Sequence, residues 1–410
     1  MNILFLSLWF PYPPNNGSRI RVYNLIKQLS KNHNITLLSF IQDDFKEENI
    51  EPLKIYCKEI VTIKSHWFNP TSFKSIIGFF HKAPRSLVDM YSKEMQIKVN
   101  EKIKNEKYDL IFCSQIFTSM YSLHLNKITK IFDEIEIGIV KDRQNIRYKL
   151  TWWKMRYYLK NILPKYDGYT VVSDKEKNNI INIDSYALGT IIPNGIDTTE
   201  INFSFNSNAK DLIYTGSLTY EANYDAIKYF LEEIYPLIKK EIPNISLKIT
   251  GSTKGINING LKLDETVKLT GYLDDIKPLI TNSSVCIVPL RIGGGTRVKI
   301  LEAAALGTPI VSTKKGAEGL KGLQPLYNIS HFQSNLSKGL FEQNEPNHPF
   351  NICIADNPLM FTKAVVALSM DREMARQIAK NARKLVEQRY NWNKIGEQYE
   401  TFIKEVFNKK

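Results

Sequence analysis

A glycine-rich turn followed by two cations and a carboxylate is the feature of this sequence best suited to chemistry. Residues 288–313 read VPLRIGGGTRVKILEAAALGTPIVST, with three glycines at 293–295 between a buried strand and a helix. Arg297, Lys299 and Glu302 follow within the first two turns of that predicted helix. Amide groups at a glycine-loaded helix start form an anion site, and two cations there suit a pyrophosphate. A carboxylate one turn later accepts hydrogen bonds from sugar or ribose hydroxyls. The stretch therefore predicts a nucleotide-sugar site.

The two cations of this motif cannot both point the same way from one formed turn. Arg297 and Lys299 are two residues apart, which is about 200° around a helix. Either one of them lies on the loop, or Lys299 bends back along its long stem. Arg297 is the better candidate for the diphosphate.

Alternating strand and helix patterns must position this motif, and they occur in two series. Such alternation indicates parallel sheets covered on both sides by helices. The first series has strands at 3–8, 35–40, 110–113, 128–132 and 168–172 and a helix at 19–30. The second has strands at 211–214, 246–250, 267–269, 285–288 and 309–312 and a helix at 222–240. Residues 190–209, rich in turn formers, are interpreted as the linker, and a last helix is expected at 392–407.

Length and composition agree with a soluble protein of two α/β domains. The chain has 410 residues, 43% hydrophobic and 24% charged. No apolar run reaches the roughly 18 residues of a membrane span, and the amino terminus reads as a strand rather than a signal peptide. Four scattered cysteines favour buried free thiols in a reducing compartment over disulfides or zinc. A cytoplasmic location is expected, with peripheral contact at the inner membrane face as a further hypothesis.

The net charge of +13 is concentrated in the amino-terminal half. Such an excess attracts phosphates, anionic lipid or nucleic acid, but nucleic acid is disfavoured because none of its binding motifs occurs. The segment Lys141–Lys165 holds eight basic residues and one acidic residue, interleaved with aromatic ones. That composition suits anionic lipid headgroups. The alternative is that its aromatic stripe packs on the first domain while its charges face water.

Several further motifs carry a resemblance to a known family. They include IIPNGID (191–197), YTGSLTYEANYDAIKYF (214–230), LTGYLDDIKPLI (269–280) and the amino-terminal PYPPNNGSRIRVYNLIKQL. With the glycine-rich motif they resemble the retaining glycosyltransferases of family 4. The branch with a G-x-G-x-R-x-K-x-L-E-A sequence, found among bacterial capsule and exopolysaccharide sugar transferases, is the most similar. The resemblance extends over nearly the whole chain.

This resemblance implies the GT-B fold, with two Rossmann-like domains facing across a cleft. Residues 1–187 would form the acceptor domain, residues 188–390 the donor domain, and residues 391–410 a helix returning to the first domain. The implied reaction transfers a sugar from a nucleoside-diphosphate-sugar to a hydroxyl of a glycan, lipid-linked or protein acceptor, with retained anomeric configuration. The implied process is synthesis of surface polysaccharide or glycoconjugate.

The family roles carry over to positions on both domains. In the donor domain, Glu302 would hold the ribose hydroxyls and the main chain of Tyr272 would meet the nucleobase. Where many members have a first glutamate, this chain has Gly294. The implied donor contacts are Gly17, Ser18, Gly216, Ser217, Tyr272, Gly294, Gly295, Thr296, Arg297, Lys299 and Glu302. Of the carboxylates Asp133, Glu134 and Glu136, the first and last are the candidates to orient or deprotonate the acceptor, beside catalytic Arg297 and Lys299.

No cofactor or metal is expected beyond the donor substrate. No Asp-x-Asp occurs, and the histidines are not spaced as metal ligands. The positive loop would instead stabilise the departing diphosphate, whose own oxygen helps to deprotonate the acceptor in such enzymes. A non-catalytic nucleotide-sugar-binding protein, or an inverting transferase or epimerase on the same fold, remains an alternative. A Rossmann dehydrogenase is disfavoured because no G-x-G-x-x-G follows residues 3–8.

Overall fold

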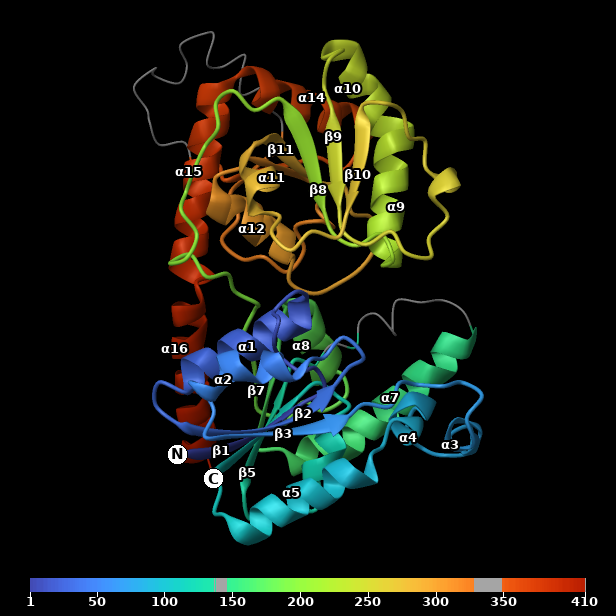
Figure 1. The fold of residues 1–410 in the computed structure, drawn as a ribbon, viewed down its shortest axis with the longest axis vertical. Helices are drawn as coiled ribbons and strands as arrows, with labels where there is room; N and C mark the ends of the chain where they lie inside the picture. Colours follow the sequence, from blue (N-terminus) through green and yellow to red (C-terminus); the bar gives the residue numbers. More distant parts are fainter. Residues whose placement is uncertain (136, 138–145, 328–348, 410) are drawn as a thin grey trace. The chain divides into compact units, whose positions relative to one another are not determined.

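The computed structural model describes residues 1–135, 137, 146–327 and 349–409 (Figure 1). The chain divides into two compact units. Unit 1 comprises Met1–Asn194 together with Trp392–Lys410, and unit 2 comprises Gly195–Asn391. Within the described residues, each unit contains one parallel sheet of seven strands. Two Rossmann-like α/β units were the predicted fold class, and this prediction is confirmed.

The sheet of unit 1 has the strand order β3-β2-β1-β4-β5-β6-β7. Its central strands read as nearly continuous apolar runs, as expected for parallel strands covered on both faces. The strands are β1 (Asn2–Ser7), β2 (Asn34–Ile41), β3 (Glu59–Lys64), β4 (Leu110–Ser114), β5 (Thr129–Asp133), β6 (Gly168–Val171) and β7 (Gly189–Ile191). The helices are α1 (Gly17–Leu29), α2 (Glu51–Lys54), α3 (Phe73–Ile77), α4 (Arg85–Asp89), α5 (Lys93–Asn105), α7 (Ile146–Ile162), α8 (Asp174–Ile181) and α16 (Trp392–Asn408). Short 3₁₀ turns lie at Glu47–Ile50, Ser119–Ser122 and Leu163–Lys165.

Each face of this sheet belongs to a separate apolar core. Alternate residues of β1 point to opposite sides, as the two-residue period of a strand requires. Ile3 and Phe5 pack in one cluster with residues of α1 and α16, whereas Leu4 and Leu6 pack in the other with residues of α5 and α7. The closing helix α16 is thus part of the unit 1 core, as the fold prediction held.

Helices α1 and α16 approach each other closely. A Cβ placed on Gly396 would lie 2.9 Å from the Cβ of Gln28, so a glycine is required at this point of α16. Helix α1 begins earlier than predicted, because the Asn16 side chain caps it by accepting from the Arg19 amide at 3.0 Å. Gly17 and Ser18 therefore lie in the first turn of α1 rather than on a loop before it.

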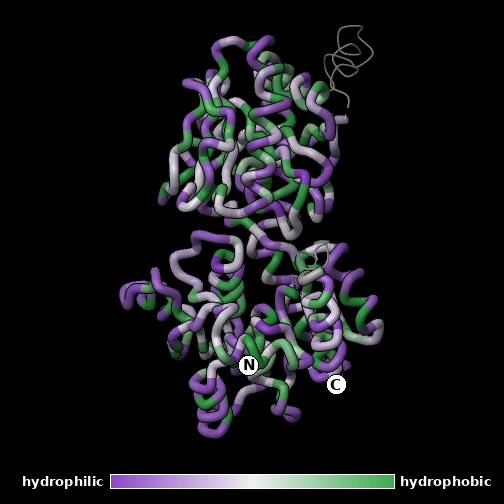
Figure 2. Tube along the Cα trace, turned by 90° about the vertical axis from the view of Figure 1, so that its right-hand side faces the viewer, coloured by the Kyte–Doolittle hydropathy of each residue, from purple (hydrophilic) through white to green (hydrophobic). Residues whose placement is uncertain are grey.

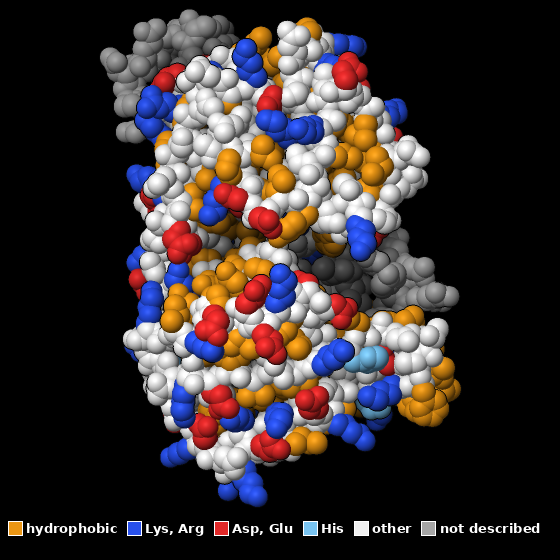
Figure 3. Space-filling model, in the orientation of Figure 1, with side chains coloured by type: hydrophobic (Ala, Val, Ile, Leu, Met, Phe, Trp, Pro, Cys, Tyr) orange, Lys and Arg blue, Asp and Glu red, His pale blue; other side chains and the backbone are white. Residues whose placement is uncertain are grey.

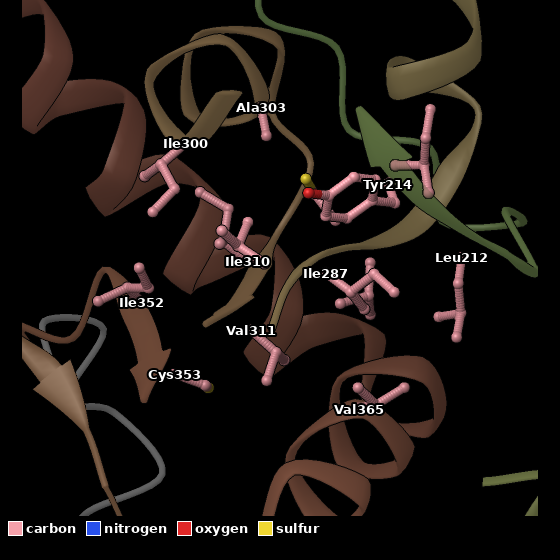
Figure 4. Packing of buried hydrophobic residues seen from close by; sticks show 14 of the residues in the cluster. Leu212, Tyr214, Ile287, Ile300, Ala303, Ile310, Val311, Ile352, Cys353 and Val365 are labelled. Carbon is pink, nitrogen blue, oxygen red and sulfur yellow. The ribbon is translucent and has the colours of Figure 1, made fainter. Parts of the chain in front are cut away.

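The sheet of unit 2 has the strand order β10-β9-β8-β11-β12-β14-β13. The strands are β8 (Asp211–Thr215), β9 (Leu247–Thr250), β10 (Val267–Gly271), β11 (Ser283–Val288), β12 (Ile310–Ser312), β13 (Pro325–Leu326) and β14 (Ile352–Ile354). The helices are α9 (Glu221–Tyr229), α10 (Tyr235–Glu241), α11 (Lys277–Thr281), α12 (Val298–Leu306), α14 (Pro358–Met370) and α15 (Arg372–Arg389), with a 3₁₀ turn at Ile258–Gly260. Figure 4 shows Ile287 and Val311 of adjacent strands close to Val365 of α14 in the single core cluster of this unit.

The sequence prediction missed both edge strands of the unit 1 sheet, β3 and β7, and the unit 2 strands β13 and β14, whereas it found the edge strand β10 at 267–269. Strand β3 is mostly half-buried and its residues EIVTIK are of mixed polarity, so its pattern is weak. Strand β7 occupies the first residues of the segment assigned to the linker, and that assignment is wrong for Thr190 and Ile191. The helix predicted at 222–240 is interrupted by a π-helical turn at Phe230–Ile234, just before Pro236, which lacks an amide proton.

Figure 2 shows hydrophobic and hydrophilic stretches alternating at short intervals along the tube. Within the described residues, no helix combines the length and the hydropathy that crossing a membrane requires. All the cysteines are buried free thiols, as predicted.

Candidate functional site

Three glycines end three neighbouring strands of unit 2 at the same edge of the sheet. Gly216 follows β8, Gly251 follows β9 and Gly271 ends β10, with φ values of +139°, +108° and +71°. The Gly251 amide donates to the Gly271 carbonyl at 2.9 Å. A Cβ on Gly251 would lie 2.6 Å from the carbonyl carbon of Gly216. Bare backbone at the carboxyl ends of parallel strands is where a sheet of this class accepts a ligand.

Hydrogen bonds of the Asn223 and Ser217 side chains hold the turn after β8. The Asn223 side-chain amide donates to the Ser217 carbonyl at 2.7 Å. The Ser217 hydroxyl donates to the Ser252 carbonyl at 3.1 Å and lies 2.7 Å from the hydroxyl of Thr219. The structure thus gives Ser217 a role in shaping the turn. Its predicted hydrogen bond to a phosphate stays a prediction.

Lys299 projects from α12 to this same turn. Its Nζ donates to the side-chain oxygen of Asn223 at 3.1 Å and lies 3.9 Å from the centre of the Tyr214 ring. A Cβ on Gly216 would come within 2.9 Å of Nζ, so the glycine leaves room for the ammonium group. Burial lowers the pKa of Lys299 to about 7. A cation held in so enclosed a position at the end of β8 gains most from an anionic ligand.

Arg297 lies on the loop, which resolves the conflict of direction between the two cations. It precedes α12 as the N-cap, with φ −82° and ψ 74°, so the helix begins at Val298 and not before Arg297 as predicted. Its guanidinium donates to the Gly294 carbonyl at 2.7 Å and to the Lys315 carbonyl at 3.3 Å. Arg297 is 7% exposed and also contributes to the lowered pKa of Lys299. The two positive charges therefore act on one region.

The glycine loop between β11 and α12 packs against the start of α9. Gly293 and Gly295 have φ values of +101° and +80°, which favour glycine. A Cβ on Gly293 would lie 3.3 Å from the Cβ of Ala222. The glycine loop that holds Gly294, Gly295 and Thr296 thus begins beside α9, whose Asn223 bonds both to the turn after β8 and to Lys299.

Glu302 and Tyr272 complete the predicted donor positions. Glu302 is on α12 one turn after Lys299, and burial raises the pKa of its carboxyl to about 7. The Tyr272 side chain follows Gly271 and is 57% exposed, so its ring is accessible for stacking. Their roles with ribose and base stay predictions.

The opposed pKa shifts of Lys299 and Glu302 predict a minimum of their joint contribution to stability near pH 7. Between pH 4.5 and 7 the folded state binds more protons at Glu302 than the unfolded state, so stability falls as pH rises. Between pH 7 and 10.5 the unfolded state binds more protons at Lys299, so stability rises with pH. The variant Lys299→Met/Glu302→Gln is expected to exceed the original protein in unfolding free energy by about 2 kcal/mol or more near pH 7.

Urea unfolding at several pH values checks this expectation. The difference in unfolding free energy between the variant and the original protein should narrow toward pH 4.5, where Glu302 no longer destabilises the folded state. It should also narrow toward pH 10.5, where Lys299 no longer does. The control variant Lys254→Met/Glu265→Gln changes two exposed side chains and should give no such profile. A margin that is constant with pH contradicts the buried placement of these charges.

A second group of polar side chains lies at the carboxyl edge of the unit 1 sheet. Gln115 follows β4 with φ +68° and Glu134 follows β5 with φ +56°. Non-glycine residues with positive φ are uncommon and cluster at functional sites. The side-chain amide of Gln115 donates to the Ser18 hydroxyl at 2.8 Å and to the Glu134 carboxylate at 3.1 Å. The sequence analysis missed Gln115, because nothing in its local pattern signals a left-handed backbone.

The structure contradicts the catalytic role predicted for Asp133. Asp133 is fully buried and forms a two-pronged ion pair with Arg21 at 2.9 and 3.1 Å. The hydroxyls of Thr170 and Tyr399 donate to the same carboxylate. A carboxylate so completely bonded inside the core cannot reach an acceptor hydroxyl. Glu136, the other candidate, lies outside the described residues, as do residues 141–145 of the basic segment.

Metal ligands were not expected from the sequence. Across the described part of the chain, no group of three or more His, Cys, Asp or Glu side chains is arranged to hold a metal ion.

Comparisons with known proteins agree with the two-unit division of the chain. A family model described as Glycosyltransferase Family 4 matches residues 15–200, and one described as Glycosyl transferases group 1 matches residues 209–328. The chain is 21% identical to an uncharacterized 44.6 kDa protein in the cps region of Klebsiella pneumoniae, covering 96% of this chain and 97% of that one.

Solved structures with a similar fold cover almost the whole chain. Anabaena Alr3699/HepE in complex with UDP and glucose has a TM-score of 0.63 at 15% identity, covering 99% of this chain and 100% of that one. A mutant of S. aureus TarM in complex with fondaparinux, α-GlcNAc-glycerol and UDP has a TM-score of 0.65 at 12% identity, covering 98% and 99%. At these identities the likeness shows the fold.

Proposed function

Because the protein belongs to the family 4-like GT-B glycosyltransferases, we propose that it transfers a sugar from a nucleoside-diphosphate-sugar to an acceptor hydroxyl during surface polysaccharide synthesis. The relative in a cps region supports a role in capsule-type polysaccharide. The complex of HepE with UDP and glucose supports a nucleotide-sugar donor. The observation that carries the proposal is the convergence of Lys299 and Arg297 on the glycine-lined edge of the unit 2 sheet.

In the proposed donor site, the diphosphate binds between the turn after β8 and the glycine loop before α12. Lys299 binds a phosphate oxygen beside Gly216, and Arg297 places a second positive charge at the start of α12. Glu302 accepts hydrogen bonds from the ribose hydroxyls, and Tyr272 lies against the base. Anion binding offsets the cost of holding Lys299 charged in an enclosed site, because an opposite charge favours the protonated amine.

The proposed reaction retains the anomeric configuration and proceeds without a metal ion. The bond between the anomeric carbon and the diphosphate oxygen breaks, and the acceptor oxygen forms its bond on the same face of the sugar. The acceptor proton passes to the departing diphosphate. Arg297 and Lys299 stabilise the negative charge that develops on the diphosphate, which supports metal independence.

For the acceptor side, we propose that Glu134 replaces Asp133 as the orienting carboxylate. Glu134 follows β5, is 7% exposed where Asp133 is fully buried, and is linked through Gln115 to Ser18 at the start of α1. Hydrogen bonds of the Gln115 side chain hold it against Glu134 and Ser18, and both Gln115 and Glu134 have the positive φ that clusters at functional sites. A glycan or lipid-linked hydroxyl is the proposed partner of this group.

Peripheral contact with an anionic membrane is proposed for the described part of the basic segment Lys141–Lys165. Helix α7 and the residues after it supply the basic and aromatic side chains of this part. Anionic headgroups attract clustered lysine and arginine, and aromatic rings favour the membrane interface.

Thermal unfolding with a panel of nucleotides and nucleotide-sugars tests the proposed function. The preferred donor is expected to raise the unfolding midpoint in a concentration-dependent manner. NMR of the transferred sugar then reads its anomeric configuration. Stabilisation without any hydrolysis or transfer would identify a binding protein. An absence of stabilisation by every nucleotide would contradict the donor site.

A further inference from the structure

The part of unit 1 around α3 carries a dense exposed apolar surface. Phe73 is 78% exposed and Phe80 is 91% exposed. We define the α3 patch as Trp67, Phe73, Ile76, Ile77, Phe79 and Phe80, all of which are exposed. Single exposed apolar residues are ordinary, whereas contiguous patches mark sites of interaction. Six large side chains within fourteen residues therefore need a partner.

Hydrogen bonds from Arg85 and Lys154 hold the backbone of the α3 patch in place. The Arg85 guanidinium donates to the carbonyls of Pro70 at 2.7 Å and Ser75 at 2.9 Å. The Lys154 ammonium donates to the carbonyls of Gly78 at 2.8 Å and Phe79 at 2.7 Å. These backbone carbonyls are thus hydrogen-bonded, while the apolar side chains of the patch remain exposed. The backbone that carries the patch is therefore held in a defined conformation.

Helix α7 continues this surface. Along one stripe of this helix, exposed residues recur at helical spacing, among them Lys149, Leu150, Trp153, Arg156, Tyr157 and Lys160. The rings of Trp153 and Tyr157 stack at 6.3 Å, and Nζ of Lys82 lies 5.4 Å from the centre of the Tyr157 ring. Because Lys154 of the same helix binds the backbone at Gly78 and Phe79, the stripe and the α3 patch adjoin.

The two segments that form this combined surface contain basic residues and no acidic ones. The sequence contains no Asp or Glu from residue 60 to 88, nor within α7. It does contain Lys74, Lys82 and Arg85 beside the patch, in addition to the basic residues of the stripe. Figure 3 shows hydrophobic side chains gathered over α3, with Lys, Arg and His side chains close by. Apolar and aromatic groups among positive charges match an anionic lipid surface.

We propose that the α3 patch inserts into the headgroup region of an anionic phospholipid bilayer, with the α7 stripe lying along the same surface. Insertion removes the phenylalanine and isoleucine side chains from water, and the basic residues neutralise lipid phosphates. A protein partner fits less well because lysine is depleted in protein interfaces. This inference extends the α7 contact proposed above and does not depend on sugar transfer.

Vesicle co-sedimentation of the full chain tests the insertion. The original protein should bind vesicles of phosphatidylcholine with phosphatidylglycerol and bind pure phosphatidylcholine far more weakly. Phe73→Ser/Phe80→Ser should weaken binding to the anionic vesicles about tenfold or more, since two phenyl rings lose their burial. Ile55→Ser/Tyr186→Ser, which changes residues that are 77% and 96% exposed elsewhere in unit 1, should bind as the original protein does.

The variants separate this inference from the proposals above. Binding unchanged by Phe73→Ser/Phe80→Ser overturns the role of the α3 patch, even if Lys149→Glu/Arg156→Glu reduces binding and so supports the α7 contact. An original protein that binds neither vesicle also overturns it. So does self-association, measured by light scattering, that only the phenylalanine variant abolishes. Nucleotide-induced stabilisation should be the same in all variants, because the donor site lies in unit 2.

Discussion

Replacing Arg297 by alanine is expected to lower turnover by about 100-fold or more while the protein remains folded. Arg297 supplies a fixed positive charge at the start of α12, next to the enclosed ammonium of Lys299. The charge that develops on the departing diphosphate would lose one of its two stabilising cations. Its hydrogen bonds to the carbonyls of Gly294 and Lys315 would also be lost, at a cost of about 1–3 kcal/mol in stability.

The matched control for this variant is Arg291→Ala. Arg291 precedes the same glycine loop, but its guanidinium is bonded to Asp225 at 2.6 Å and lies over the Tyr229 ring. Turnover should therefore change little in that variant. Arg297→Lys keeps the positive charge but loses the planar guanidinium, so its turnover should lie between those of Arg297→Ala and Arg291→Ala. Donor hydrolysis and calorimetric nucleotide affinity measure the effect. Near-normal turnover of Arg297→Ala would remove Arg297 from the proposed mechanism.

Replacing Asp133 by alanine is expected to cost about 3–5 kcal/mol in the free energy of unfolding of unit 1. The change leaves the guanidinium of Arg21 buried without its carboxylate. Arg21 also donates to the carbonyl of Ile192 at 3.0 Å and to the side chain of Asn194 at 2.9 Å, and it contacts Tyr399 of α16. The buried pair thus joins four segments that are far apart in sequence: α1, β5, residues 192–194 and α16.

Urea unfolding followed by circular dichroism checks the cost of losing Asp133. Glu101→Ala serves as the control, because Glu101 pairs with Lys98 at 3.0 Å and both side chains are exposed, so the loss there should be about 1 kcal/mol or less. The double variant Arg21→Met/Asp133→Leu should recover part of the loss, since no unpaired charge remains buried. A loss for Asp133→Ala no larger than that for Glu101→Ala would contradict the structural role.

The central strands could be predicted from sequence because parallel strands covered on both faces need continuous apolar residues. β1 and β11 are of this kind. The edge strand β3 and the three-residue strand β7 lack that requirement, so local pattern does not distinguish them from loops. Whether a segment pairs at a sheet edge depends on its neighbour rather than on its own residues.

The donor positions were predictable because their chemistry is local in sequence. Arg297, Lys299 and Glu302 lie within six residues, and a helix spacing relates them. Arg21 and Asp133 show the opposite case, since their partnership joins residues 112 apart. The position of Asp133 after a predicted strand suggested a contact with the acceptor, and only the folded chain shows that Asp133 neutralises Arg21.

The place of α16 in the core of unit 1 has a consequence for how the protein is made. Translation delivers the first 194 residues long before Trp392, Tyr399 and Phe402 leave the ribosome. Until then the nascent amino-terminal unit has an uncovered apolar face on the α1 side of its sheet, which chaperones bind and which favours aggregation. A message truncated before this helix therefore yields a chain with an open core, and release of the last helix is the step that completes the fold.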